Sequence, residues 1–127
     1  MQKLIIGIFL TLTLVLNATP ISDSLAAAFK SGNSTEISKH FGNSVDLSIP
    51  NNEGVYSNTQ AKLILKTFFE HNKPTGFSVV HNGDSKNNSH YSIGNLVTSK
   101  GTYRTYILYK EENKKVTILE LKIESED

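Results

Sequence analysis

Residues 90–124 read HYSIGNLVTSKGTYRTYILYKEENKKVTILELKIE, and this stretch decides the fold. Its hydrophobic runs are rich in β-branched and aromatic residues, a composition typical of β-strands. Only short polar segments separate these runs, so consecutive strands are expected to pair in antiparallel fashion. The predicted strands span 90–98, 102–110 and 116–124 and form a meander.

A further strand precedes these three. From residue 76 onward the chain is strand-like, and Phe77, Val79 and His81 stand at alternate positions, which predicts that they share one face of a strand. The polar stretch 82–89 is predicted to be a loop. Gly94 lies in the middle of the next strand, where a bulge or bend lets the sheet curl.

The clearest helix covers residues 58–72. Its apolar side chains recur at helical spacing, Ser57 and Gln60 form a capping-box pattern before it, and Pro74 prevents its continuation. The apolar positions are Ala61, Ile64, Leu65, Phe68 and Phe69.

Two shorter helices are predicted nearer the N-terminus. The first begins after Ser22 and ends at Gly32. The second is opened by Asn33, carries Ile37 and Phe41 on one face, and ends at Gly42.

Between the helices, Val45, Leu47 and Ile49 alternate with polar residues and indicate a strand, and residues 54–56 indicate at most a short one. This order of elements predicts an α+β domain, with N-terminal helices packed on one face of a curved antiparallel β-sheet. Such a sheet folded over helices makes a cone with an apolar interior.

Residues 1–18 have the features of a secretory signal peptide. Lys3 precedes the uncharged apolar run from Leu4 to Leu16, and the small residue Ala18 follows it. As a helix, this run would be about 20 Å long, too short for a hydrocarbon core of about 30 Å. We therefore expect export to the periplasm or the outside, leaving one domain over 19–127 without a transmembrane segment. The alternative is an N-terminal helix that is buried or serves as an anchor.

Composition excludes several classes of protein. Among 127 residues there is no cysteine, which excludes disulfide scaffolds, cysteine-based metal centres and thiol nucleophiles. Without residues 1–18, twelve Lys and Arg balance twelve Asp and Glu, and Arg104 is the only arginine. A neutral chain without basic clusters is not expected to bind nucleic acid.

The sequence resembles a known family. The runs FSVVHNG at 77–83, YSIGNL at 91–96, GTYRTY at 101–106 and VTILELKI at 116–123 are similar to the secreted bacterial proteins grouped as DUF4783. These proteins fall in the NTF2-like (cystatin-like α+β cone) superfamily. The resemblance implies that cone for roughly residues 21–124 and brings no activity with it. Because dimers formed sheet to sheet are frequent in the superfamily, it also implies a homodimer through the sheet.

Five residues are the candidates for binding a small apolar or aromatic ligand: His81, Tyr91, Tyr103, Arg104 and Tyr106. Tyrosine combines an apolar ring with a hydroxyl, and the arginine fork suits a carboxylate. Alternation along 102–110 predicts that Tyr103 lies on one face of its strand and that Arg104 and Tyr106 lie on the other. Cross-strand packing without a ligand is the alternative role of these side chains.

No catalytic residue, metal site or cofactor is expected. Asp46 alternates with an apolar series and should face solvent, and no other aspartate is a convincing base for the cone interior. A metal would require His81 and His90 to approach each other across the loop, without any supporting spacing. The sequence thus favours a non-enzymatic domain for ligand binding, dimerisation or interaction in the cell envelope. The alternative is an isomerase-, dehydratase- or hydrolase-like enzyme with an acid–base pair of His81 and a tyrosine in the cone.

Overall fold

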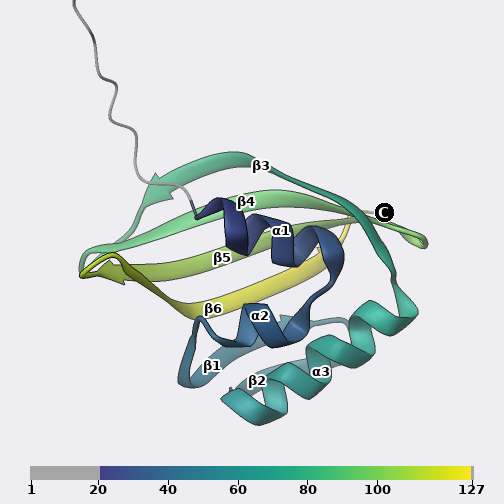
Figure 1. Ribbon diagram of the computed structural model, residues 1–127, viewed down its shortest axis with the longest axis horizontal. Helices are drawn as coiled ribbons and strands as arrows, with labels where there is room; N and C mark the ends of the chain where they lie inside the picture. The colour runs from purple at the N-terminus through teal and green to yellow at the C-terminus, as the bar shows by residue number, and fades with distance from the viewer. Residues whose placement is uncertain (1–20, 127) are drawn as a thin grey trace, which may run out of the picture.

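The computed structural model describes residues 21–126, so the signal peptide predicted at 1–18 lies outside the described residues. Helices and strands follow in the order that Figure 1 labels. They are α1 Asp23–Ser31, α2 Ser34–Ser38, β1 Phe41–Ile49, β2 Asn52–Ser57, α3 Asn58–His71, β3 Pro74–Asp84, β4 Ser89–Thr98, β5 Gly101–Glu112 and β6 Lys115–Ser125.

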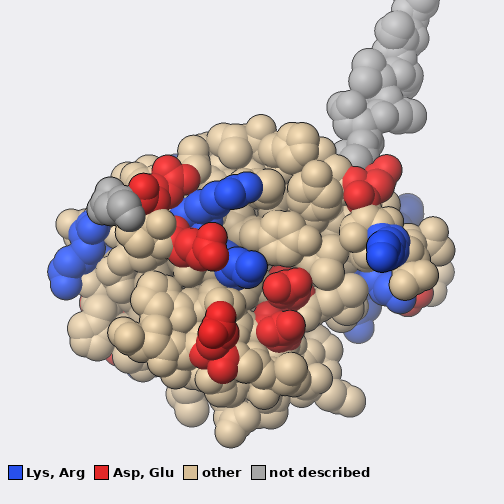
Figure 2. Space-filling view, turned by 180° about the vertical axis from the view of Figure 1, so that it is seen from behind, with Lys and Arg blue, Asp and Glu red and all other residues tan. Residues whose placement is uncertain are grey.

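The strands form one six-stranded sheet in the order β2-β1-β6-β5-β4-β3. Neighbouring strands are antiparallel, which confirms the predicted meander from β3 to β6. The exception is the pair β1 and β6, which is parallel and joins the N-terminal hairpin to the meander. The helices lie on one face of the sheet (Figure 1). Among the described elements, none covers the opposite face, which carries charged side chains of both signs close together (Figure 2).

The helices begin where the sequence provides caps. Ser22 caps α1, because its side chain accepts a hydrogen bond from the Leu25 amide at 3.2 Å. Gly32 ends this helix in the left-handed region with φ 67°. At α3 both bonds of the predicted capping box form between Ser57 and Gln60.

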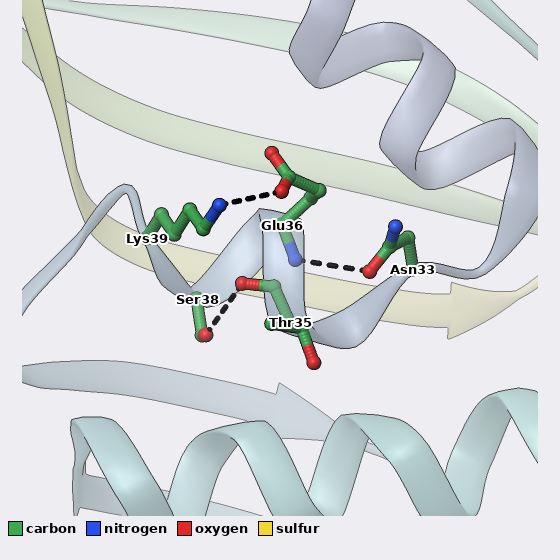
Figure 3. Close-up of polar contacts among 5 residues, drawn as sticks. All are labelled: Asn33, Thr35, Glu36, Ser38 and Lys39. Carbon is green, nitrogen blue, oxygen red and sulfur yellow. Dashed lines mark hydrogen bonds and ion pairs between the residues drawn. The ribbon is translucent and has the colours of Figure 1, made fainter.

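Helix α2 is shorter than predicted. Asn33 opens it by accepting from the Glu36 amide at 3.0 Å (Figure 3), as expected. The helix ends at Ser38, however, and the prediction that Phe41 belongs to it and that Gly42 ends it is wrong. Phe41 instead starts β1, because pairing with Ile118 of β6 buries its ring.

The loop predicted at 82–89 is also shorter in the structure. Asn82, Gly83 and Asp84 continue β3 and pair with Ser92, Tyr91 and His90. Polar side-chain contacts support this end of the hairpin: the Ser92 hydroxyl donates to Asn82 at 2.6 Å, and His90 contacts Asp84 at 2.8 Å. Likewise β2 is a full six-residue strand rather than the short one expected.

The space between the helices and the sheet is filled by side chains. Phe29 and Tyr109 are almost completely buried, and the Phe29 ring stacks on Phe77 with centroids 5.0 Å apart. Aliphatic side chains from the helices and the sheet occupy the rest of this core: Leu25, Ile37, Leu47, Leu65, Leu96, Ile107, Ile118, Leu121 and Ile123. Within residues 21–126, no helix has the length and apolar character needed to span a membrane.

Candidate functional site

The open face of the sheet is the surface that the helices leave uncovered. In β5, Thr105, Ile107 and Tyr109 are buried on the helix side, whereas the alternate residues Arg104 and Tyr106 point to the other side. This division follows the predicted alternation. Strand register extends the open face across the neighbouring strands, because residues paired directly across a ladder share a face. Its central residues are Tyr91, Ile93, Arg104, Tyr106, Leu108, Glu120, Lys122 and Glu124.

A bulge places His81 on this open face. Val79 pairs with Gly94, but His81 pairs with Ile93, so Val80 is an additional residue in the ladder. One extra residue reverses the alternation that follows it. The prediction that His81 shares a face with Phe77 and Val79 is therefore wrong, and no signal in the sequence marks Val80 as the bulge.

Three of the predicted site residues form an aromatic row on the open face. His81 Nε2 and the Tyr91 hydroxyl share a hydrogen bond at 3.2 Å. The Tyr91 ring covers Gly83 on the adjacent strand, and it stacks on Tyr106 with centroids 5.8 Å apart. Burial raises the pKa of the Tyr106 hydroxyl above its usual value, and Glu120 and Tyr91 add to this effect. The row is thus an apolar surface edged by hydroxyl and imidazole groups.

Charged residues flank the aromatic row. Arg104 pairs with Glu124 in the strand register, and Tyr106 pairs with Lys122. A hollow of about 160 Å³ lies among these four side chains. In the part of the chain that the structure describes, none of Arg104, Lys122 and Glu124 belongs to an ion pair. Their charges are accordingly available to a partner.

Tyr103, the fifth predicted site residue, lies apart from the other four. It points to the helix side of the sheet, where its hydroxyl donates to Asn72 Oδ1 at 2.9 Å and its ring meets Phe68 edge-on at 5.2 Å. It lines a separate cleft together with residues of α3 and of the two turns at that end of the sheet. The sequence did not predict that these residues form a site, because they come from segments that are distant in the chain.

The structure does not form the acid–base pair that the enzymatic alternative requires inside the cone. His81 and Tyr91 do meet, but on the open face, and His81 is exposed to solvent. Asp46 is exposed as predicted. His90 packs beside the buried Tyr109, so it lies on the face of the sheet opposite to His81. The two histidines therefore do not approach each other, as a shared metal would require. Across residues 21–126, no three His, Asp or Glu side chains are placed to bind a metal.

Comparison with known proteins identifies relatives over almost the whole described chain. The sequence model for "Domain of unknown function (DUF4783)" matches residues 22–124. A crystal structure of a DUF4783 family protein from Bacteroides fragilis is 33% identical with a TM-score of 0.75, covering 84% of this chain and 99% of that one. Another, from Bacteroides ovatus, is 30% identical with a TM-score of 0.76, covering 84% and 96%.

The fold extends beyond these relatives. A domain of unknown function with a cystatin-like fold from Nostoc punctiforme is 10% identical with a TM-score of 0.62, covering 81% of this chain and 71% of that one. Together with the helices packed on a six-stranded sheet, this likeness shows the NTF2-like (cystatin-like) α+β fold. No curated protein matches the sequence.

Proposed function

The chain belongs to the DUF4783 family, a family of unknown function, and we propose that it is a non-enzymatic binding domain that forms a homodimer through the open face of its sheet. One observation carries this proposal: the half-buried side chains Tyr91, Ile93, Tyr106 and Leu108 lie side by side in the middle of the sheet, on the face that no helix within residues 21–126 covers. Aromatic side chains at the centre of a patch are typical of protein interfaces.

The size of the open face suits a dimer. Six strands spaced about 4.8 Å apart give a sheet about 29 Å wide, and a nine-residue strand such as β1 is about 30 Å long. The product, roughly 850 Å², is close to the ~800 Å² that each partner contributes to a standard interface. Two exposed valines, Val55 and Val97, extend the apolar surface toward the edges of the same face.

The charges of the open face suit a second copy of the same chain. A two-fold interface brings the same patch of both subunits together, so a stable one must be self-complementary. Here two cations, Arg104 and Lys122, lie among three carboxylates, Asp46, Glu120 and Glu124, on adjacent strands. Rotating one copy over the other can match opposite charges around the aromatic row, whereas a patch of one sign would repel its copy.

We place this dimer outside the cytoplasm. The basis is the signal-peptide pattern of residues 1–18, with Lys3 before the apolar run and Ala18 after it. Measuring the mass of the protein recovered from the periplasm or the medium tests this part separately: a protein lacking residues 1–18 supports export, and an intact N-terminus contradicts it.

Sedimentation velocity over about 1 μM to 1 mM tests the dimer, because this range covers binding free energies of about −8 to −4 kcal/mol. We expect a reversible monomer–dimer equilibrium for the natural chain. Ile93→Lys places a charge at the centre of the open face and should leave a folded monomer. Leu63→Lys, on an exposed position of α3, is the matched control and should dimerise normally. A natural chain that stays monomeric throughout, or two variants that behave alike, would contradict the proposal.

A further inference from the structure

We propose that the cleft beside Tyr103 binds a small carboxylate with an apolar body. The Tyr103 cleft is bounded by the β1–β2 turn, the C-terminal half of α3 and the start of β5. It lies on the helix side of the sheet and is therefore independent of the dimer proposed for the open face. Its volume is about 480 Å³. This volume is within the usual range of small-molecule sites, which runs from about 300 Å³ to about 1000 Å³.

The floor of the Tyr103 cleft is apolar and held in place. Ile49 and Phe68 are more than nine-tenths buried beneath it. Tyr103 forms a wall that is fixed by its hydrogen bond to Asn72 and by its edge contact with Phe68. Asn72 is fixed in turn, because its side-chain amide donates to the Phe68 carbonyl at 2.9 Å. A ligand therefore meets a preformed apolar surface, which reduces the entropy lost on binding.

The rim of the Tyr103 cleft carries the groups that select an anion. Lys100 is exposed at the mouth, and in residues 21–126 its ammonium makes no ion pair. Of the described residues that line the cleft, none is Asp or Glu. Asn51 and Asn52 also line the cleft, and their side-chain amides are hydrogen-bond donors that suit carboxylate oxygens.

His71 adds a directional group to this rim. Its Nδ1 lies 2.9 Å from the Thr67 carbonyl, which can only accept, so Nδ1 carries a hydrogen and Nε2 is the atom left for a ligand. When protonated, Nε2 donates to a carboxylate. Lys100 and Tyr103 line the same cleft as His71. Glu70, the preceding residue on α3, also interacts electrostatically with His71, and it pairs with Lys66 at 2.9 Å in a different cleft.

A carboxylate fits the Tyr103 cleft better than a phosphate does. Phosphate recognition generally uses several cations or a nest of backbone amides around its charge. This cleft offers one lysine, Lys100, at its mouth and otherwise apolar walls and neutral amides, which matches a single negative charge attached to an apolar chain or ring.

Titration calorimetry with 4-phenylbutyrate tests the proposal, and 4-phenylbutyramide serves as the uncharged probe of the same shape. We expect saturable binding of the carboxylate with a Kd below about 1 mM. Binding of the amide should be about tenfold weaker, the usual effect of losing a charged hydrogen bond. Lys100→Gln should weaken carboxylate binding by about tenfold and leave amide binding unchanged. Lys86→Gln, the same charge change in the loop at the other end of β4, is the control and should bind as the natural chain does.

A second pair of variants tests the position of the site without relying on charge. Thr67 is exposed on α3 and lines the Tyr103 cleft, so Thr67→Trp should fill it and abolish binding of both probes. Leu63→Trp, on the same helix but outside the cleft, should have no effect. Failure of the carboxylate to bind, equal affinity for the amide, or equal effects of the two variants within either pair would overturn the proposal. The sedimentation behaviour of the natural chain decides the dimer separately.

Discussion

Replacing Gly94 by alanine probes how tightly the sheet closes over α1. A Cβ atom at this position would lie 2.6 Å from Phe77 Cζ, closer than two carbon atoms approach in proteins, and 3.0 Å from the Ser78 carbonyl oxygen, a tight contact. The half-buried Phe77 ring is stacked on the buried Phe29, so moving it away disturbs this stack. Alanine therefore forces a shift in the core or in the backbone of β3.

The magnitude follows from three contributions. Overpacking a well-packed core destabilises by about 1–3 kcal/mol, and disturbing the Phe29–Phe77 stack removes about 0.5–1.5 kcal/mol more. Alanine recovers about 0.5–1 kcal/mol, since glycine inside a strand loses more conformational entropy on folding. We expect a net loss of about 2 kcal/mol, equivalent to a Tm lower by about 8 °C for a domain of this size.

Urea unfolding followed by circular dichroism measures this loss. Gly76→Ala in the same sheet is the control, because its Cβ would meet its nearest atom, in Val97, only at 3.9 Å. Combining Gly94→Ala with Phe77→Leu should recover at least about 0.5 kcal/mol relative to additive effects, as residues in contact are coupled. Equal stability of the Gly94 and Gly76 variants, or strictly additive effects with Phe77→Leu, would show that the Gly94–Phe77 contact does not limit the packing here.

Three further results are expected. Thr105 Oγ1 is buried without a hydrogen-bond partner among the residues described, so Thr105→Val should stabilise the fold by about 1 kcal/mol in thermal unfolding; a loss of stability would contradict this. Ser57→Ala removes the hydroxyl that accepts from the Gln60 amide at the start of α3 and should destabilise the fold by about 1 kcal/mol in urea unfolding; an unchanged stability would contradict a role for this cap. Burial raises the folded-state pKa of Tyr106 and Tyr109 above 10, so their contribution to stability is complete below about pH 10 and is lost as pH rises through the folded pKa; ultraviolet titration in which all tyrosines ionise together near 10 would refute it.

Local patterns in the sequence were enough to predict most elements of the fold. Caps and helical spacing determine where α1 and α3 begin, and the short turns after Thr98 and Glu112 determine the antiparallel meander. What the sequence could not predict depends on contacts between distant segments. The start of β1 at Phe41 and the parallel pairing of β1 with β6 both arise from burial against residues more than 70 positions away.

The candidate site, too, could be predicted only where it depends on local sequence patterns. The two faces of β5 follow from simple alternation, so Arg104 and Tyr106 could be assigned to one face from sequence. His81 could not, because the bulge at Val80 reverses the alternation and only the register with β4 reveals it. The Tyr103 cleft combines residues from two turns and a helix, such as Asn51, His71 and Lys100, and no local pattern brings these together.

A dilution series of two-dimensional NMR spectra tests most directly whether the outer surface of the sheet is where this protein binds its own copy. We expect amide shifts to change with protein concentration in β4, β5 and β6, most strongly around Ile93 and Tyr106, while those of α1 and the helix side stay constant. Spectra that do not change with concentration, or changes confined to the helices, would contradict it.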